Sequence, residues 1–475
     1  MKNRGTDGWV VWGAVGAAAT LAAASGAAWG QARVPGVDMP DVYKVLESSP
    51  SYRGSGIVGR AMGPDGSARE GFASENMTLL SWLAFDDFPT DPDRGSSCWG
   101  YVSPSGREYA LYGMSTGTAF VDITDPVNPV IVGVIAGPYS WWREMKVMGH
   151  YAYSVNETGS GIQVIDMSQI DQGVVTWVKN KTQGGHATTH TLASNPDSGY
   201  IYLCGANIAN GGLVAVSTTN PSDPVIVGSW SGAYVHEAQV VSYTSGPYAG
   251  KEIAFLFSSG RVRIVDVTSK SNMHQISEGF YEGTRYSHQG WASGDRRWLY
   301  LDDEFDEIKG RNRTTTHIFN IENIYAPTYV GFWQGPLAAT DHNQYWHEGR
   351  LYQANYNSGL QVLDATDPIN LERIAYFDTF PASDKAGFGG AWSCFPYYPS
   401  GSVIISDILS GLYTVRLGVP CPGDFNGDGS ANTLDVSAFL NAWASGGEGA
   451  DFNEDGSINT LDVAAFLNAW AAGCG

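Results

Sequence analysis

A short segment recurs seven times in this sequence, and the repetition constrains the fold more than any other feature. Each copy is an apolar, strand-like run that often ends in Asp, and in several copies a Pro-containing turn and a second apolar run follow. The copies start about 50 residues apart, at Gly117, Gly161, Gly212, Gly260, Thr316, Gly359 and Gly411. Two further strand-like runs precede each copy. Four strands repeated at this spacing are typical of β-propeller blades, so we predict an all-β fold with a seven-bladed β-propeller.

The last copy ends at Leu417 and has no fourth strand after it. An unmatched run, NMTLLSWLAF from Asn76, stands before the first blade and resembles the fourth strands of the other blades. We therefore predict that it completes the last blade and closes the ring, which removes an exposed sheet edge. This places the propeller in residues 75–418.

The N-terminus is typical of a signal peptide over residues 1–32. Basic MKNR precedes an apolar stretch from Trp9 to Ala24, and small residues follow it. Residues 33–74 then form a linker. No other stretch is long and apolar enough to span a membrane. We expect an exported protein that is secreted, on the cell surface or in the periplasm, and that has no transmembrane span in its mature form.

Charge excludes one class of partner. The formal net charge is −21, which would repel a phosphate backbone, so we expect no nucleic-acid partner.

Two twelve-residue segments near the C-terminus, DFNGDGSANTLD and DFNEDGSINTLD, have the spacing of calcium-binding loops. The candidate calcium ligands are Asp424, Asn426, Asp428, Ser430, Asn432 and Asp435 in the first loop, and Asp451, Asn453, Asp455, Ser457, Asn459 and Asp462 in the second. This spacing supplies the oxygen ligands that calcium prefers, so we predict two calcium ions. Each loop ends in Asp where EF-hands usually have Glu.

A nearly identical helix is expected after each loop, in VSAFLNAW from Val436 and VAAFLNAW from Val463. Their apolar faces should pack together as a pseudo-twofold pair. Cys421 and Cys474 bracket this module, residues 421–475, and we expect them to form a disulfide. The pairing of Cys98, Cys204 and Cys394 stays open, because sequence does not give bonding distance.

The duplicated loops and helices, together with the terminal Gly-Cys, resemble a dockerin of the GC type found on exported bacterial proteins. The resemblance implies docking to a cohesin-like or cell-surface protein. It also implies an association with polysaccharide-degrading complexes, although the propeller shows no recognisable pair of glycosidase carboxylates.

The propeller segment resembles the choice-of-anchor B family, whose blades are LVIVD-type repeats. The resemblance is carried, in order, by CWGY at Cys98, GTAFVDITDP at Gly117, WREMKV at Trp142, HEAQ at His236, HQGW at His288, LDDEFDE at Leu301, DHNQYW at Asp341, LYQANYNSGLQVLD at Leu351 and GAWSCFP at Gly390. It implies a propeller attached to varied surface or sorting anchors. The family has no established activity, so the resemblance implies architecture and no chemistry.

Four histidines stand at the start of expected inner strands: His190, His236, His288 and His342. Inner strands start at one mouth of a propeller, and the loops between second and third strands should face the same mouth. These loops carry Glu157, the acidic run from Asp302 to Glu307, and Tyr356. The imidazoles could hold a transition metal, as four histidines do in the seven-bladed carotenoid oxygenases, an analogy of fold alone. Alternatively, they are polar ties between blades.

Three functional interpretations remain open. We favour a non-enzymatic binding or scaffold propeller tethered through its dockerin, with a peptide or glycan ligand at the mouth. The alternatives are a metalloenzyme that uses the histidine ring and a polysaccharide-associated protein. No HExxH motif and no G-x-x-x-x-G-K-[ST] phosphate-binding loop indicates another chemistry.

Overall fold

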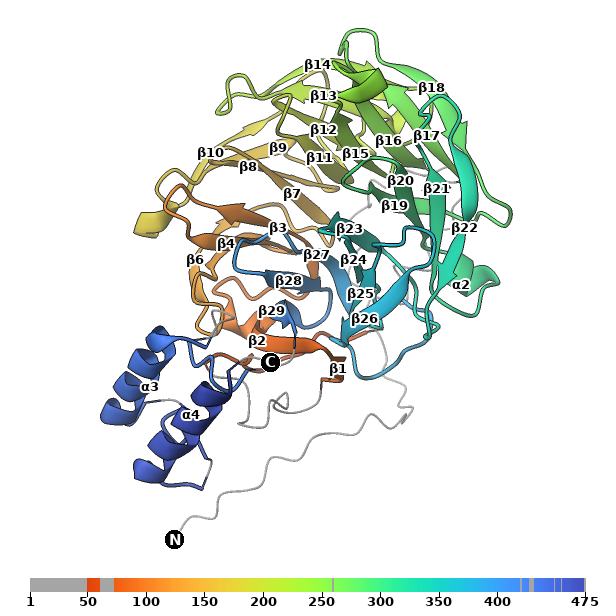
Figure 1. Cartoon of the computed structure of the whole chain (residues 1–475). Coiled ribbons are helices and arrows are strands. Elements are labelled where there is room, and N and C mark those ends of the chain that lie inside the picture. Colours follow the sequence, from red (N-terminus) through yellow and green to blue (C-terminus); the bar gives the residue numbers. More distant parts are fainter. Residues whose placement is uncertain are drawn as a thin grey trace, which may run out of the picture. The chain divides into compact units, whose positions relative to one another are not determined.

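Seven antiparallel sheets form the main body of the protein, as the computed structural model shows (Figure 1). The structure describes residues 49–59, 72–258, 260–418, 421–426, 431–447, 449–453 and 455–473. The innermost strands β3, β7, β11, β15, β19, β23 and β27 each contact the next around a closed ring. The predicted seven-bladed β-propeller is therefore confirmed. The expected signal peptide, most of the linker, and residues Asp428, Ser430 and Cys474 lie outside the described residues.

The first four blades follow one another along the chain. From the innermost to the outermost strand they are β3 (Gly95–Val102), β4 (Glu108–Met114), β5 (Gly117–Asp122) and β6 (Val130–Ala136); β7 (Arg143–Met148), β8 (Tyr151–Asn156), β9 (Ile162–Asp166) and β10 (Thr176–Lys181); β11 (Thr191–Asn195), β12 (Tyr200–Cys204), β13 (Leu213–Ser217) and β14 (Val225–Trp230); and β15 (Glu237–Ser242), β16 (Glu252–Ser258), β17 (Arg261–Asp266) and β18 (His274–Gly279).

The last three blades bring the two ends of the propeller together. They are β19 (Ser287–Ala292), β20 (Trp298–Asp303), β21 (Thr315–Asn320) and β22 (Thr328–Gln334); β23 (Asn343–His347), β24 (Arg350–Ala354), β25 (Leu360–Asp364), β26 (Glu372–Phe377) and β1 (Ser74–Glu75); and β27 (Ala391–Phe395), β28 (Ser402–Asp407), β29 (Gly411–Leu417) and β2 (Met77–Leu83). The short strand β1 adds a fifth strand to the sixth blade, which the sequence did not predict.

Blade seven is completed by the N-terminal strand, as expected. Strand β2 pairs antiparallel with β29, from Met77 opposite Leu417 to Leu83 opposite Leu412. The Trp82 ring stacks on Tyr413 with centroids 5.4 Å apart, and its indole nitrogen donates to the carbonyl oxygen of Ser410. The ring is therefore closed by backbone pairing and by aromatic packing between distant parts of the chain.

The Asp that recurs at the end of third strands has a local structural role. The Asp122 carboxylate accepts a hydrogen bond from the backbone N–H two residues on, at 3.0 Å, and Asp166, Asp266 and Asp364 do the same in their blades. An Asp side chain that binds its own backbone in this way starts a turn. The Asp of the repeat thus ends the third strand and directs the chain into the fourth.

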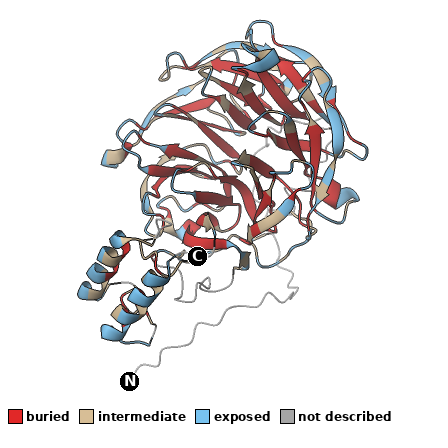
Figure 2. Ribbon diagram, viewed as in Figure 1, coloured by how far each residue is buried: buried red, intermediate tan, exposed pale blue. Residues whose placement is uncertain are grey.

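Burial follows the order of strands within a blade (Figure 2). Strands β4 and β5 are buried along their whole length, whereas the outermost strand β6 is partly exposed. Apolar side chains pack between neighbouring blades, for example Phe120 of blade one in a cluster with Ile165 of blade two. A strand covered on both faces needs a continuous apolar run, which is the pattern of the repeat.

The remaining elements are short turns of helix and two longer helices. The short ones are η1 (Phe85–Asp87), η2 (Ile170–Gln172), η3 (Ala209–Gly211), η4 (Gly246–Tyr248) and α2 (Asp306–Lys309). The longer ones are α3 (Thr433–Ser445) and α4 (Thr460–Ala472), and each begins at the tenth position of a predicted calcium loop rather than after the loop. Of the helices described, none is both long and apolar enough to cross a bilayer.

Candidate functional site

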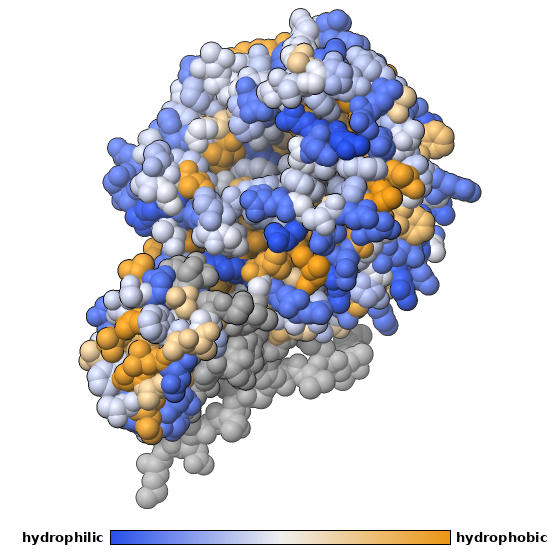
Figure 3. Space-filling view, viewed as in Figure 1, coloured by the Kyte–Doolittle hydropathy of each residue, from blue (hydrophilic) through white to orange (hydrophobic). Residues whose placement is uncertain are grey.

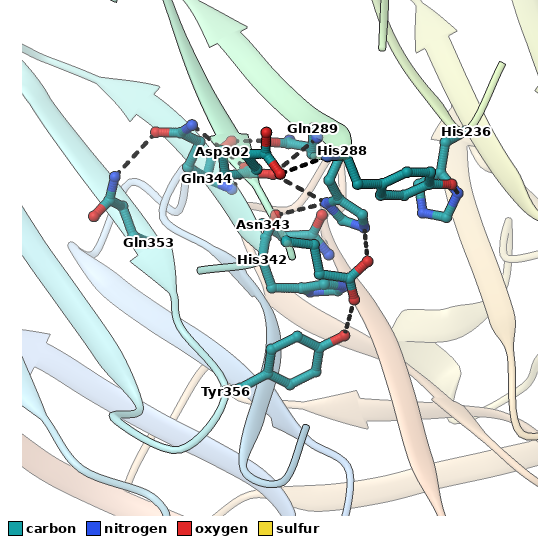
Figure 4. Close-up of polar contacts among 12 residues, drawn as sticks. His236, His288, Gln289, Asp302, His342, Asn343, Gln344, Gln353 and Tyr356 are labelled. Atoms are coloured by element: carbon teal, nitrogen blue, oxygen red, sulfur yellow. Dashed lines mark hydrogen bonds and ion pairs between the residues drawn. The ribbon is translucent and has the colours of Figure 1, made fainter. Parts of the chain in front are cut away.

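The four predicted histidines lie side by side as an arc. His190, His236 and His342 each directly precede an inner strand, and His288 is the second residue of β19. Successive ring centroids are 4.1 Å apart from His190 to His236, 4.5 Å from His236 to His288, and 4.4 Å from His288 to His342. Figure 4 shows His288 between the other two labelled imidazoles. Because the blades repeat, equivalent positions become neighbours around the axis.

The Nδ1 atom of each imidazole has a fixed partner. His190 Nδ1 lies 2.6 Å from Glu157 Oε1, and His236 Nδ1 lies 2.7 Å from the Tyr286 hydroxyl. His288 Nδ1 lies 3.0 Å from Asp302 Oδ1 and 2.9 Å from the His342 carbonyl oxygen. His342 Nδ1 lies 2.5 Å from the Trp392 carbonyl oxygen. These contacts fix the orientation of all four rings.

The second-to-third-strand loops contribute the acidic residues, as predicted. Glu304, directly after β20, places its Oε2 atom 3.9 Å from His288 Nε2. Its Oε1 atom accepts a hydrogen bond of 2.7 Å from the hydroxyl of Tyr356, which follows β24. The contact of Glu157 with His190 arises in the same way after β8. The prediction that these loops face the starts of the inner strands is confirmed.

Burial sets the ionisation of the imidazoles. Burial lowers the pKa of His236 well below its usual value, and the other three imidazoles lower it further. It also lowers the pKa of His288, and that of His342 well below the usual value. In His190 burial acts in the same direction, but the hydrogen bond and charge of Glu157 outweigh it, so the pKa of His190 is raised. Neutral imidazoles expose a nitrogen lone pair, which metal binding requires.

The carboxyl groups behind the arc are also shifted by burial. Burial raises the pKa of Asp302 well above its usual value. It raises the pKa of Glu304 too, although the charge of His288 and the Tyr356 hydroxyl oppose the shift. A buried carboxyl group with a raised pKa is characteristic of functional sites, but also of structural polar networks.

Three of these side chains form a compact cluster. In the described ranges, one group of three or more possible metal ligands has its ligand atoms within 4.8 Å of one another: His236, His288 and Glu304. All three are buried, with exposed fractions of 4%, 2% and 6%. The predicted ring of four histidines thus lies together, but the group that could share one ion contains two of them and a glutamate. The same residues also provide the polar ties between blades.

Aromatic side chains cover the arc. Trp142, Tyr286, Phe305, Tyr356, Phe388 and Trp392 belong to one buried cluster. The Trp392 ring lies 4.2 Å from His342 and stacks on Trp142 at 4.7 Å. The aromatic cluster therefore packs against the arc at His236, His288 and His342. Tyr286 was not among the predicted site residues, although Tyr234-Val-His236 and Tyr286-Ser-His288 share a Tyr-x-His pattern that could have indicated it.

The second candidate site is the loop–helix pair near the C-terminus. Asp435 and Asp462 each accept backbone hydrogen bonds within their own loop, from Asn426 and Asn432 in the first and from Asn453 and Asn459 in the second. The Asn432 and Asn459 side chains also cap α3 and α4. Burial acts to raise the pKa of Asp462, but the backbone donors outweigh it, and the pKa is lowered.

The other predicted ligands of the second loop turn toward one another. Both carboxylate oxygens of Asp451 accept backbone hydrogen bonds, from Asp455 at 3.1 Å and from Gly456 at 2.9 Å. The Asn453 amide oxygen accepts from the same Asp455 N–H, and the Ser457 carbonyl accepts from the Asn459 amide. In the first loop Asp424 is described, whereas Asp428 and Ser430 lie outside the described residues.

The two loop–helix units pack as a symmetric pair. The Phe439 and Phe466 rings stack with centroids 4.3 Å apart and an interplanar angle of 18°. The Trp443 indole nitrogen donates to the Asn459 carbonyl oxygen, and the Trp470 indole nitrogen donates to the Asn432 carbonyl oxygen. Each helix thus contacts the loop of the other unit.

The fold and the sites define the class of this protein, a seven-bladed β-propeller joined to a paired loop–helix module. Residues 422–469 match the family described as Dockerin type I domain, so the chain carries a domain of this type. No curated protein sequence matches the chain.

Two solved structures are similar to this chain. One is a protein from Lactobacillus plantarum, with 13% identity over 69% of this chain and 97% of that chain, at a TM-score of 0.47. The other is the β-propeller domain of Myceliophteria thermophila Cps50 (Swd1), with 11% identity over 68% of this chain and 95% of that chain, at a TM-score of 0.46. Similarities this distant carry no argument about function, and the propeller assignment rests on the sheet topology.

Proposed function

We propose that this chain is an exported protein whose dockerin domain binds two calcium ions and docks to a cohesin-bearing partner. The observation that carries the proposal is the duplicated loop–helix unit, in which each helix holds the loop of the other. Calcium supplied to both loops would neutralise acidic side chains that otherwise repel one another, and would order the module for docking. The propeller is then the domain that docking delivers to an assembly.

An exposed apolar surface on the helical module supports docking. Leu434 and Leu461 occupy the same position of the two loops and are 62% and 61% exposed. Leu440 and Leu467 are equivalent positions on the two helices and are also exposed. Figure 3 shows hydrophobic side chains gathered on this module. Exposed apolar groups that repeat in both units would give the partner two equivalent surfaces.

We extend the proposal to the families of both domains. The terminal Gly-Cys supports a GC-type dockerin, and the ordered motifs of the propeller support membership of the choice-of-anchor B family. The basic and apolar N-terminal stretch supports export. An association with polysaccharide-degrading complexes would follow from the partner that the dockerin binds.

Capture of the full chain by immobilised type I cohesin modules tests the proposal. We expect capture in calcium and at least a tenfold loss in a calcium chelator. The double variant Asp424→Ala/Asp451→Ala should also lose capture, whereas Asp125→Ala, at an exposed turn of the propeller, should bind like the wild type. Calorimetry should give two calcium ions per chain. Capture that survives the chelator and the double substitution would contradict calcium-dependent docking.

A further inference from the structure

The compact cluster of His236, His288 and Glu304 has the composition of a metal site that is distinct from the calcium loops. Two imidazole nitrogens and one carboxylate oxygen suit zinc or ferrous iron, whereas calcium prefers oxygen ligands alone. The three residues come from different parts of two adjacent blades: the start of β15, the start of β19 and the end of β20. Strand pairing therefore fixes their relative positions.

Each of the three side chains makes a hydrogen bond through an atom that would not bind the ion. Tyr286 holds His236 through Nδ1, Asp302 holds His288 through Nδ1, and the Tyr356 hydroxyl holds Glu304 through Oε1. Outer contacts of this kind, above all a carboxylate on the distal nitrogen of a histidine, orient metal ligands in proteins. The atoms that would face an ion are Glu304 Oε2 and the two Nε2 atoms, of which that of His236 is hydrogen-bonded to His190 Nε2.

The gap between Glu304 and His288 is narrow enough for one ion to contact both side chains. Their facing atoms are 3.9 Å apart, which is too long for a hydrogen bond. It is shorter than two metal–ligand bonds of about 2.1 Å each, so one ion could contact both atoms. On the other side, His236 Nε2 is hydrogen-bonded to His190 Nε2 at 3.0 Å, and an ion would replace the proton that these nitrogens share. Two nitrogens bound to one ion at right angles have about this separation, so His190 adjoins the site as a further nitrogen donor.

We propose that His236, His288 and Glu304 bind one divalent transition-metal ion of the zinc or ferrous class at the starts of the inner strands. The ion joins two adjacent blades, because His236 belongs to blade four and the other two residues belong to blade five. Three protein ligands leave a coordination position for water or for another donor such as His190. The proposed site lies in the propeller alone and does not depend on calcium or docking.

Elemental analysis of the full-length protein tests the site. Because the cluster is buried, the ion should enter during folding, so the protein is produced in medium supplemented with zinc or, anaerobically, with ferrous iron. We expect about one transition-metal ion per chain after dialysis. Glu304→Gln keeps the shape of the side chain and an oxygen for Tyr356, and should lower the bound ion at least tenfold. His288→Ala should do the same.

Two control variants show whether a loss of the ion is specific to the cluster. His274→Ala removes an exposed histidine of the outermost strand β18 and should keep the full ion content. Asp451→Ala weakens a calcium loop and should also keep the full transition-metal content. The metal result is therefore independent of whether the docking proposal holds. Cobalt(II) in place of the native ion should give an absorption spectrum characteristic of nitrogen ligands. Glu304→Gln should change that spectrum.

Either of two results would overturn the site. One is a wild-type protein that folds in supplemented medium yet holds no stoichiometric transition metal. The other is an ion content that stays the same in Glu304→Gln and His288→Ala. If His288→Ala fails to fold, the Glu304→Gln variant decides the matter, because it preserves volume and hydrogen bonding.

Discussion

The indole nitrogen of Trp470 donates a hydrogen bond to the carbonyl oxygen of Asn432 across 2.8 Å, and so joins the second dockerin helix to the first loop. Trp443 makes the reciprocal contact with Asn459 at 2.9 Å. Asn432 and Asn459 occupy the ninth position of their loops and directly precede the helices. The order of each loop therefore depends on the helix of the other unit.

Because each helix contacts the loop of the other unit, a change in one helix should affect calcium binding at the other unit's loop. With the second loop disabled by Asp451→Ala, Trp470→Phe should weaken calcium binding at the first loop about fivefold, the effect of one hydrogen bond of about 1 kcal/mol. Trp443→Phe should change it less. With the first loop disabled by Asp424→Ala, the order of the two variants should reverse. Calorimetry of the four double variants measures this, and equal effects in both backgrounds would show that the contacts are not specific to one loop.

Tyr356 should tune the proposed metal site without being a ligand. Its hydroxyl orients the Glu304 carboxylate at 2.7 Å, so Tyr356→Phe should keep one ion per chain but raise its dissociation constant about tenfold. Competition with a chromophoric chelator measures the constant. Tyr139→Phe removes a hydroxyl that donates to Asp93 on the propeller surface and is the matched control. Equal constants for the two variants would remove Tyr356 from the site.

His186 should make the protein less stable in acid. It is 1% exposed, its Nε2 contacts the Thr189 hydroxyl at 2.7 Å, and burial lowers its pKa to about 4. Because an unfolded histidine has a pKa near 6.5, the unfolded chain takes up this proton first as the pH falls. The penalty is absent above pH 6.5 and grows to about 3 kcal/mol as the pH falls toward 4.

Urea unfolding between pH 7 and pH 5, in saturating calcium, measures this effect. His186→Gln should show a smaller loss of stability over that range than the wild type. His274→Gln, an exposed histidine of β18, should keep the wild-type slope. A His186→Gln variant with an unchanged slope would mean that another group causes the acid sensitivity.

Trp82 should be essential to the closure of the propeller. It is 5% exposed and stacks on Tyr413 of the neighbouring strand. Trp82→Ala leaves a cavity at the pairing of β2 with β29, and should cost about 3–5 kcal/mol of unfolding free energy. Trp177→Ala, on the outermost strand β10 and 53% exposed, should cost less than about 1 kcal/mol. Thermal and denaturant unfolding of the two variants provide the comparison.

The five cysteines should divide into three thiols and one disulfide. Cys98, Cys204 and Cys394 are free and fully buried, and burial raises the pKa of Cys98 to about 12. A thiol reagent should therefore label none in the native protein, three in denaturant and five after reduction. Five labelled thiols in denaturant without reduction would show that Cys421 and Cys474 do not pair.

The sequence predicted those features that depend on repetition. Seven similar segments indicated the blades, and the missing fourth strand after Leu417 indicated the role of β2. Repetition also brought His190, His236, His288 and His342 together, because equivalent positions are neighbours around a ring. The two loop–helix units were recognisable for the same reason.

Features without a repeat were harder to predict. Glu304 stands in an acidic run with Asp302, Asp303, Asp306 and Glu307, and only the course of the loop after β20 turns this residue toward His288. The small extra strand β1 depends on an encounter between Ser74–Glu75 and β26, which has no sequence signal. Whether the four imidazoles converge on one point likewise depends on the direction of each side chain, which the position of a residue in its strand does not determine.

The pairing of β2 with β29 also has a consequence during synthesis. Trp82 and the Ser410 carbonyl that it contacts are 328 positions apart, so β2, one of the first two strands to be made, waits for β29, the last. At roughly 5–20 residues per second, the interval is about 16 to 66 seconds. Throughout it the growing ring has two unsatisfied edges and cannot reach its final form. Assembly is therefore completed only after the whole propeller has been translated. A chain cut short before Gly411 would leave an open, aggregation-prone fragment with unpaired strand edges.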